Sequence, residues 1–202
     1  MTITPGTAAF YDDWAANGQE SARSAISKHF ASAFTPGARV LDVGCGMGRD
    51  LAVLREMGFD AYGVEPHGAM RARAIERHPD LAGRIVAASL PQIGQPFGGG
   101  FDAIVCSAVL MHVAADALPA SLASLSAVLA ARARVLMAVP EMDADRLVDG
   151  RDPDGRAFSN HAPTHVQRLM AELGFALRSR AEIAAPSTDT RWRVLLFGRE
   201  VR

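Results

Sequence analysis

A glycine-rich segment early in the chain has the residue types and spacing of a nucleoside-binding loop. Residues 41–48 read Leu-Asp-Val-Gly-Cys-Gly-Met-Gly. Glycines allow a positive φ and let the backbone approach a ligand closely. Glu65 follows 23 residues after Asp42, at a position where a carboxylate can accept hydrogen bonds from both hydroxyls of a ribose. The pattern therefore predicts a site for a nucleoside.

The same loop departs from the pattern that binds a dinucleotide. That pattern is G-x-G-x-x-G, and its third glycine allows close packing of helix against strand. Gly44 and Gly46 fit the first two positions, but Arg49 occupies the third. The spacing here is G-x-G-x-G, so nothing in the loop is arranged for a pyrophosphate. An NAD-dependent oxidoreductase stays as a disfavoured alternative.

Histidines supply the candidates for proton transfer and metal binding. His112 follows a predicted strand at the ligand side of the sheet and titrates near working pH, which makes it a candidate general base. The alternative is that it orients the loop before Asp116. His161 and His165 are spaced like metal ligands, but Pro163 lies between them and no third ligand is near. We predict no metal site.

An alternation of strands and helices would position these residues. Helical patterns occupy residues 7–33, with a break near Asn17-Gly18, and then residues 47–57, 68–77, 116–130 and 163–173. Strand patterns occupy residues 39–43, 60–64, 84–88, 101–106, 134–139, 175–183 and 192–200. This rhythm predicts a doubly wound, mostly parallel α/β sheet that ends in an antiparallel strand pair. Such a sheet binds ligands outside the carboxyl ends of its strands, where the glycine loop falls.

Composition limits the domain count and the kinds of partner. The chain has 202 residues, with 21 basic and 22 acidic side chains and a formal net charge of −1. The length is typical of one domain. The charge balance argues against a nucleic-acid binder with a broad basic face. Cys45 and Cys106 are too few for a disulfide framework, and their apolar surroundings favour a reducing compartment.

The termini and apolar runs carry no sign of secretion or membrane insertion. Residues 1–14 lack a basic stretch followed by an apolar one, so we expect no secretory signal. The longest apolar run, residues 103–111, is too short to span a bilayer. The sequence predicts a cytoplasmic protein without a membrane partner.

Three motifs together resemble one known family. VLDVGCGMGRD, AYGVEP and FDAIVCSAVLMHV occur in this order between residues 38 and 140. They resemble the class I S-adenosylmethionine-dependent methyltransferases, in particular the small-molecule branch, and matches of this length are far more specific than a lone glycine pattern. The resemblance implies a Rossmann-like, seven-stranded sheet. It also implies S-adenosyl-L-methionine as cofactor and S-adenosyl-L-homocysteine as product.

The resemblance assigns cofactor contacts along the chain. The glycine loop would pass under the methionine part of the cofactor, Glu65 would hold the ribose, and an N-terminal tyrosine would cover the ligand. The serine that follows the third strand stands where many members have an aspartate, but it can still form a hydrogen bond. The expected contact residues are Tyr11, Asp42, Gly44, Cys45, Gly46, Gly48, Glu65, Pro66, Ser89, Leu90, Cys106, Ser107 and Ala108.

The resemblance also divides the single domain, residues 1–202, into four parts. Residues 1–35 would form a helical lid, 38–140 the cofactor-binding core, 141–160 a substrate loop, and 161–202 a helix with the closing strand pair. Three arginines of the loop could recognise a carboxylate or phosphate of the substrate. Alternatively they pair with neighbouring aspartates of a solvated loop. These arginines are Arg146, Arg151 and Arg156.

The function that follows is methyl transfer to a small-molecule acceptor. In-line displacement depends mainly on holding nucleophile and methyl group in contact, and His112 would help as a general base. No Asn/Asp-Pro-Pro-aromatic sequence follows Cys106, which argues against methylation of nucleic-acid amines. A non-catalytic S-adenosylmethionine-binding protein is the main alternative. Oxygen, nitrogen, carbon and sulfur acceptors all stay open, as does the oligomeric state.

Overall fold

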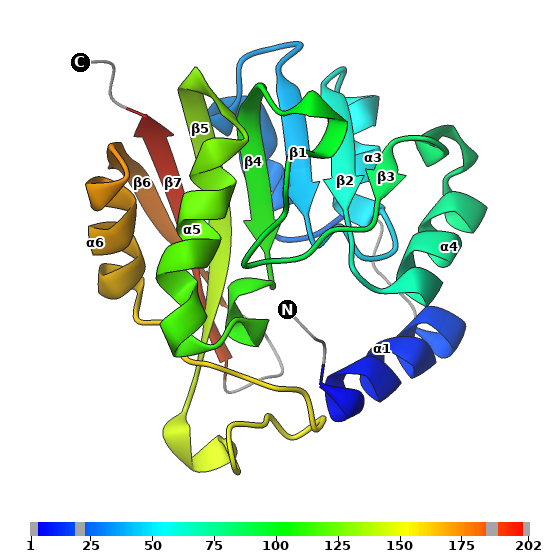
Figure 1. Ribbon diagram of the computed structural model, residues 1–202, viewed down its shortest axis with the longest axis vertical. Coiled ribbons are helices and arrows are strands. Elements are labelled where there is room, and N and C mark those ends of the chain that lie inside the picture. Colours follow the sequence, from blue (N-terminus) through cyan, green and yellow to red (C-terminus); the bar gives the residue numbers. More distant parts are fainter. Residues whose placement is uncertain (1–3, 19–22, 185–189, 200–202) are drawn as a thin grey trace.

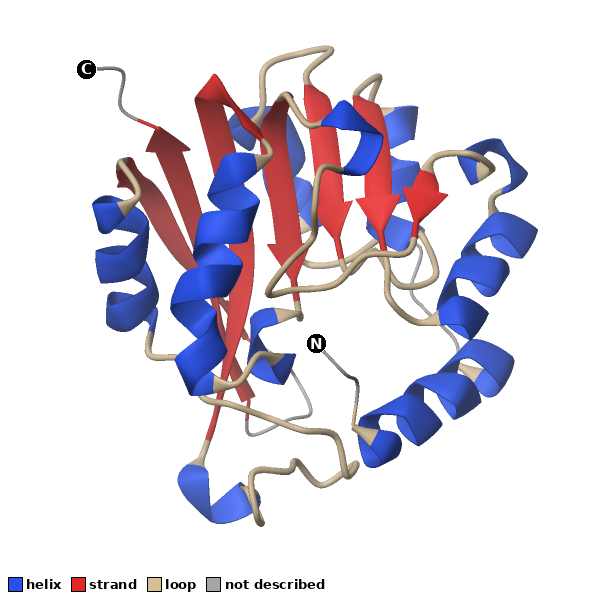
Figure 2. Cartoon of the chain, in the orientation of Figure 1, coloured by secondary structure: helices blue, strands red, loops and turns tan. Residues whose placement is uncertain are grey.

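A computed structural model describes residues 4–18, 23–184 and 190–199. Its described part contains one seven-stranded sheet in the order β3-β2-β1-β4-β5-β7-β6, with helices on both faces (Figures 1 and 2). The strands are β1 (Arg39–Val43), β2 (Asp60–Val64), β3 (Ile85–Val86), β4 (Phe101–Ser107), β5 (Leu129–Met142), β6 (Phe175–Ala184) and β7 (Thr190–Arg199). The α-helices are α1 (Pro5–Asn17), α2 (Phe30–Ala33), α3 (Arg49–Glu56), α4 (Gly68–Arg77), α5 (Leu118–Ala127) and α6 (Pro163–Glu172).

The pairing of the strands confirms the predicted fold class. Strands β3, β2, β1, β4 and β5 run parallel, and β7 is antiparallel to both β5 and β6. Strands of a parallel sheet are covered on both faces, so they read as continuous apolar runs. In β1, Val40 and Leu41 are both fully buried although they point to opposite faces.

Each face of the sheet has its own hydrophobic core. Leu41 and Val43 pack on one side with apolar residues of α5 and α6, among them Leu122 and Val166. On the other side Val40 packs with residues of α2 and α3. Figure 1 shows α5 and α6 in front of the sheet and α3 behind it. The two layers fix the sheet between them and leave its ends for the loops.

Several predicted boundaries were wrong by a few residues, each for a local reason. The first core helix begins at Arg49 rather than residue 47, because Gly48 has φ +83°, which is outside the helical region. The predicted helix 116–130 is α5 with a short 3₁₀ turn before it. It ends at Ala127 because β5 starts at Leu129, which pairs with Phe101.

The strand predictions differ in length more than in position. Predicted strand 84–88 is reduced to the two residues of β3, which is the edge strand beyond β2. β5 is much longer than the predicted 134–139, because its extra residues pair with β7. The predicted helical stretch 7–33 contains α1, a 3₁₀ turn and α2. Residues 19–22 and the predicted link at 186–189 lie outside the described residues, as does Glu200.

Two segments that are distant in the sequence lie beyond the carboxyl ends of the parallel strands. Figure 1 shows α1 below β2 and β3, and the segment that follows β5 curving toward the start of α1. Both α1 and α6 carry proline in their first turn, where the missing N–H is not needed. No helix among the described residues is long and apolar enough to cross a membrane.

Glycines at the two ends of α3 allow a matched test of its packing. Gly48 and Gly58 have φ +83° and +85°, a region that costs other residues about 1–2 kcal/mol. A Cβ on Gly48 would lie 2.8 Å from Cδ1 of Leu81, whereas a Cβ on Gly58 would meet nothing within 4 Å. Only Gly48 is therefore also constrained by packing against its neighbours.

We expect Gly58→Ala to lower the free energy of unfolding by about 1–2 kcal/mol through backbone strain alone. Gly48→Ala should lower it by roughly 1–3 kcal/mol more, because the added methyl group overpacks the contact with Leu81. Chemical denaturation of both variants measures the difference. Equal losses would mean that the Leu81 side chain gives way without cost.

Candidate active site

The glycine loop joins β1 to α3 and is held against the end of β2. The backbone N–H groups of Gly44 and Cys45 both donate to the carbonyl of Val64, at 2.8 and 3.1 Å. Gly44 has φ +70°, and a Cβ there would lie 2.5 Å from Cγ2 of Val109. The loop therefore passes so close to the segment after β4 that only glycine fits.

Glu65, directly after β2, ties the glycine loop to the next loop. One carboxylate oxygen, Oε2, accepts a hydrogen bond from the backbone N–H of Gly46 at 3.0 Å, and Oε1 accepts from that of His67 at 2.8 Å. The residue is only 8% exposed. Burial raises the pKa of Glu65, and the two backbone hydrogen bonds oppose this rise.

A cavity of about 190 Å³ opens between this loop, the end of β4 and α1. It brings together most of the residues that the sequence predicted to contact a cofactor, and also the predicted base. These residues are Tyr11, Asp42, Gly44, Cys45, Gly46, Glu65, Pro66, Ser107, Ala108 and His112. The order of the strands places them at one site, because β1, β2 and β4 are neighbours and all end here.

Four predicted contact residues do not line this cavity. Gly48 faces Leu81. Leu90 and Cys106 are buried in the core on the α5 side, and burial raises the pKa of the Cys106 thiol to about 12. Ser89 pairs with Gln92 in an isolated bridge. A cofactor contact at these four positions stays a prediction.

The cavity has further lining residues that the sequence reasoning missed. They are Thr7, Trp14, Arg49, Asp50, Met70 and Val109. Helical spacing could have identified two of them, because residues 7, 11 and 14 fall on one face of α1. Asp50 is a carboxylate in the first turn of α3 and is only 6% exposed.

The backbone at the end of β4 adopts a conformation that is unfavourable for its residue type. Ala108 has φ +58°. A residue other than glycine costs about 1–3 kcal/mol there, and such strain collects at ligand sites. The turn at Ala108 directs the next residues, Val109 and His112, toward the cavity.

Tyr11 and His112 form a hydrogen-bonded pair at the cavity wall. The Tyr11 hydroxyl lies 2.8 Å from Nε2 of His112. The other ring nitrogen, Nδ1, lies 2.8 Å from the carbonyl oxygen of Ala157. A carbonyl oxygen only accepts, so Nδ1 carries the hydrogen. In the neutral ring Nε2 is then an acceptor, and the Tyr11 hydroxyl donates to it.

The surroundings favour the neutral forms of both side chains. Burial lowers the pKa of His112 below its ordinary 6.5, although the hydrogen bond to the Ala157 carbonyl opposes this effect. Burial raises the pKa of Tyr11 to about 12, with the nearby Arg156 guanidinium acting in the opposite direction. The pair is therefore uncharged at pH 7, with a basic nitrogen facing a phenol.

The three arginines of the predicted substrate loop do not line the cavity. Arg156 forms ion pairs with Asp152 at 2.7 Å and Asp154 at 3.1 Å. Arg151 donates to the carbonyl of Gly155 at 2.8 Å, and Arg146 is exposed. Pairing of loop arginines with loop aspartates was the alternative interpretation, and Arg156 follows it. Substrate recognition by these arginines stays a prediction.

The two histidines considered as metal ligands lie elsewhere. His161 is buried, and its Nε2 lies 2.9 Å from the backbone carbonyl of Val113. His165 lies beside Arg168, with Nε2 3.4 Å from a guanidinium nitrogen. Within the described residues, no group of three or more His, Cys, Asp or Glu side chains could hold a metal ion.

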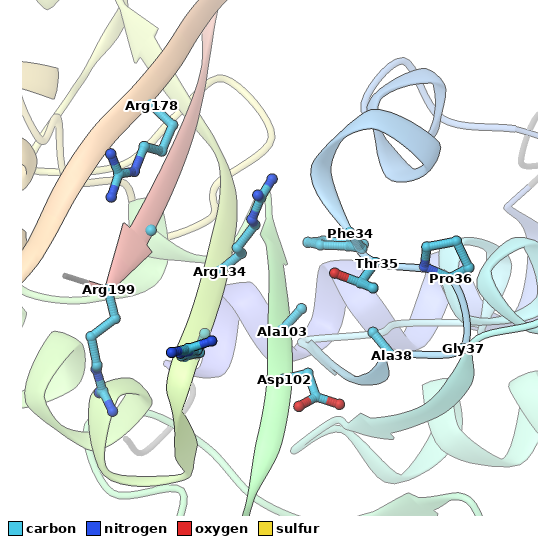
Figure 3. A pocket seen from close by; sticks show the side chains of 13 residues that line it. Phe34, Thr35, Pro36, Gly37, Ala38, Asp102, Ala103, Arg134, Arg178 and Arg199 are labelled. Atoms are coloured by element: carbon cyan, nitrogen blue, oxygen red, sulfur yellow. The ribbon is translucent and has the colours of Figure 1, made fainter. Parts of the chain in front are cut away.

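A larger hollow, of about 670 Å³, lies at the opposite end of the sheet. Figure 3 shows Arg134, Arg178 and Arg199 around it, on β5, β6 and β7, with Phe34 across from them. Arg199 has a structural role, since it donates hydrogen bonds to the backbone carbonyls of Ser126 and Ala130. The hollow contains none of the glycine-loop residues, so its size does not make it the active site.

Comparison with known proteins places this geometry in a family. A family model described as a methyltransferase domain matches residues 14–180. The 1,6-didemethyltoxoflavin-N1-methyltransferase of Burkholderia thailandensis, crystallised with S-adenosylhomocysteine, is 19% identical with a TM-score of 0.76. The alignment covers 97% of this chain and 88% of that one.

Curated relatives agree over parts of the sequence. A protein-L-isoaspartate O-methyltransferase of Methylorubrum extorquens is 37% identical over 92 residues, which is 46% of this chain. The match spans only 39% of that relative's length. The magnesium-protoporphyrin O-methyltransferase of a Synechocystis species is 25% identical over 167 residues, 79% of this chain and 72% of the relative.

The fold, the glycine loop and the cavity are thus found where the sequence motifs predicted them. The family match covers residues 14–180 of 202. The chain therefore belongs to the methyltransferase-domain family and has the class I methyltransferase fold that its motifs resemble.

Proposed function

We propose that this chain transfers a methyl group from S-adenosylmethionine to a small-molecule acceptor. One observation carries the proposal: a single cavity joins the glycine loop and the Glu65 carboxylate to the Tyr11–His112 pair. The first two suit a nucleoside, and the pair suits an acceptor that must lose a proton. S-adenosylhomocysteine is the product, and the Burkholderia structure holds it.

The residues present fit this cofactor. Glu65 is a buried carboxylate at the cavity wall, so it can accept hydrogen bonds from ribose hydroxyls in addition to its two backbone donors. Gly44 and Gly46 line the cavity with bare backbone, and a Cβ on Gly44 would collide with Val109. Asp42 is 2% exposed and lines the same cavity, which suits a cationic ammonium group.

In the proposed reaction, the residues of the chain mainly position the acceptor, and one basic nitrogen accepts its proton. S-adenosylmethionine supplies an activated methyl group on a sulfonium, which is a good leaving group. The walls of the cavity would hold the acceptor against that methyl group, which alone supplies several kcal/mol. Nε2 of His112 would take the acceptor's proton, since Nδ1 already donates to Ala157. The Tyr11 hydroxyl must first release Nε2 or pass the proton on.

Other features support a small acceptor and a reducing environment. Neighbours of this fold are named for toxoflavin and magnesium-protoporphyrin substrates. The cavity has a volume of about 190 Å³ and is lined in part by α1, which suits a small molecule better than a nucleic acid. Cys45 and Cys106 are buried free thiols, which agrees with the expected cytoplasmic location.

Calorimetry with S-adenosylhomocysteine, S-adenosylmethionine and NAD tests the cofactor. We expect binding of the two adenosyl compounds and none of NAD. Glu65→Ala should weaken adenosyl binding roughly 100-fold, because two hydrogen bonds to a charged acceptor are lost. Glu76→Ala is the matched control, since Glu76 is an exposed carboxylate on α4. Binding of NAD, or unchanged affinity in Glu65→Ala, would overturn the cofactor assignment.

Radiolabelled methyl transfer to an acceptor found by a substrate screen tests His112. His112→Gln should lower turnover about 10²- to 10⁴-fold while leaving S-adenosylhomocysteine affinity unchanged. Because burial lowers the pKa of His112, the wild-type rate should fall only at pH values below 6.5, and this acid limb should vanish in the variant.

His165→Gln provides the control for a histidine outside the cavity, on α6. Unchanged turnover in His112→Gln would remove the general-base role and leave proximity alone. Binding without turnover of any screened acceptor, in wild-type protein, would instead favour the non-catalytic S-adenosylmethionine-binding alternative.

A further inference from the structure

A compact turn after β5 contacts His112 and also α1, the helix that carries Tyr11. The turn, residues 148–158, is closed by isolated bridges that join Arg151 to Val148 and to Ala157. Two glycines with positive φ, Gly150 and Gly155, reverse the chain. This segment belongs to the predicted substrate loop, but the backbone N–H and carbonyl of its residue Ala157 face α1 and His112.

The buried carboxylate of Asp152 organises the turn. Its side chain has no exposed surface. Oδ1 accepts hydrogen bonds from the backbone N–H groups of Asp154 at 3.1 Å and Arg156 at 2.9 Å. Oδ2 accepts from Nε of Arg156 at 2.7 Å. A buried charge that is satisfied in this way fixes its donors, because breaking such a pair leaves an uncompensated charge in the interior.

Arg156, which Asp152 holds, and the next residue, Ala157, make the contacts of the turn with its surroundings. The guanidinium of Arg156 lies 4.5 Å from the centre of the Phe10 ring on α1. The backbone N–H of Ala157 donates to the Thr7 hydroxyl of α1 at 2.8 Å. The carbonyl of the same Ala157 accepts from Nδ1 of His112. The backbone of one residue, Ala157, thus contacts both α1 and the predicted base.

These contacts form a closed circuit of hydrogen bonds. Thr7 and Tyr11 lie one helical turn apart on the same face of α1. Thr7 joins Ala157, Ala157 joins Nδ1 of His112, and Nε2 of His112 joins Tyr11. The position of α1 and the proton arrangement of His112 are therefore set by the same turn.

The size of the cavity implies that this circuit opens during the reaction cycle. Its volume of about 190 Å³ is below the roughly 300–1,000 Å³ of most small-molecule pockets. A cofactor and an acceptor together need more room, and α1 forms one wall. Outward movement of α1 would break the bonds of Thr7 and Tyr11, while the bond from Ala157 to His112 belongs to the core side and can persist.

We propose that Asp152 is a positioning residue, which holds the 148–158 turn so that the backbone of one residue, Ala157, fixes both the Nδ1–H tautomer of His112 and the closed position of α1. The inference deepens the proposed function, since it concerns how the predicted base and lid of the same site are held. Asp152 itself touches neither cofactor nor acceptor. It acts through Arg156 and Ala157.

Two measurements on the full chain test the proposal. ¹⁵N NMR of the imidazole nitrogens at pH 7.5 reports the His112 tautomer, and stopped-flow displacement of S-adenosylhomocysteine reports opening of the lid. In Asp152→Asn we expect the His112 nitrogens to move from a pure Nδ1–H pattern toward an average of both tautomers. The release rate should rise roughly tenfold, because several hydrogen bonds of the turn weaken together.

Asp154→Asn is the matched control for loss of a carboxylate in the same turn. Asp154 also pairs with Arg156, but its side chain is 55% exposed, so we expect both readouts to stay within twofold of wild type. Thr7→Val removes the bond from Ala157 to α1 and leaves the bond from Ala157 to His112 in place. It should speed ligand release roughly fivefold and leave the His112 tautomer unchanged.

Arg156→Lys covers the case in which Asp152→Asn does not fold. It keeps a positive charge beside Asp152 but removes the Nε donor, and it should shift both readouts in the same direction as Asp152→Asn, by less. An unchanged tautomer and release rate in the folded variants would overturn the proposal. So would equal effects of Asp154→Asn and Asp152→Asn.

The outcomes also distinguish this inference from the proposed function. The tautomer measurement needs neither cofactor nor acceptor. A chain that fails to bind S-adenosylhomocysteine would refute the proposed function, yet a tautomer shift confined to Asp152→Asn and Arg156→Lys would still support the positioning role.

Discussion

The parallel hydrogen bonding of β1 to β2 on one side and β4 on the other is the constraint on which the site depends. Asp42 pairs with Gly63 and with Val105, so the three strands end at one level. The glycine loop, Glu65 and the turn at Ala108 lie close together because each directly follows one of these three strands. The sheet order also leaves the neighbouring side of β4 for β5, whose extension carries the chain to the 148–158 turn.

Two buried carboxylates, Glu65 and Asp152, each stabilise a loop by accepting backbone hydrogen bonds. Glu65 accepts backbone N–H groups from two loops, and Asp152 accepts backbone N–H groups within one turn. In both cases backbone donors compensate the cost of burying a charge, which is large for an isolated ion. Each carboxylate thereby fixes the conformation of the loop residues whose N–H groups it accepts. Glu65 lines the cavity, while the Asp152 side chain is fully enclosed.

Burial favours the uncharged forms of Tyr11 and His112. The pKa of His112 is lowered and that of Tyr11 is raised, both chiefly by removal from water. The Ala157 carbonyl then decides which ring nitrogen carries the hydrogen. The fold thus holds His112 as a neutral ring with a defined tautomer, through a backbone contact rather than a second charged side chain. The proposed role of general base requires this state.

The fold class and the expected cofactor-contact residues could be predicted from the sequence alone. Both follow from local patterns: apolar runs in alternation with helices, and a glycine loop followed at fixed distance by Glu65. Strand and helix existence could be read from these patterns because each element buries an apolar face. Exact ends could not, since pairing partners decide them, as the extension of β5 along β7 shows.

The contacts of the Tyr11–His112 pair could not be predicted from the sequence. Tyr11, His112 and Ala157 are separated by 101 and 45 positions, and no local propensity links them. The role of Asp152 was invisible for the same reason: in the sequence it is one of several aspartates in a charged loop, which usually pairs with arginines in solvent. Asp152 is enclosed in a turn that packs against α1 through Ala157 and Arg156. That packing joins segments far apart in the chain, and no residue spacing records it.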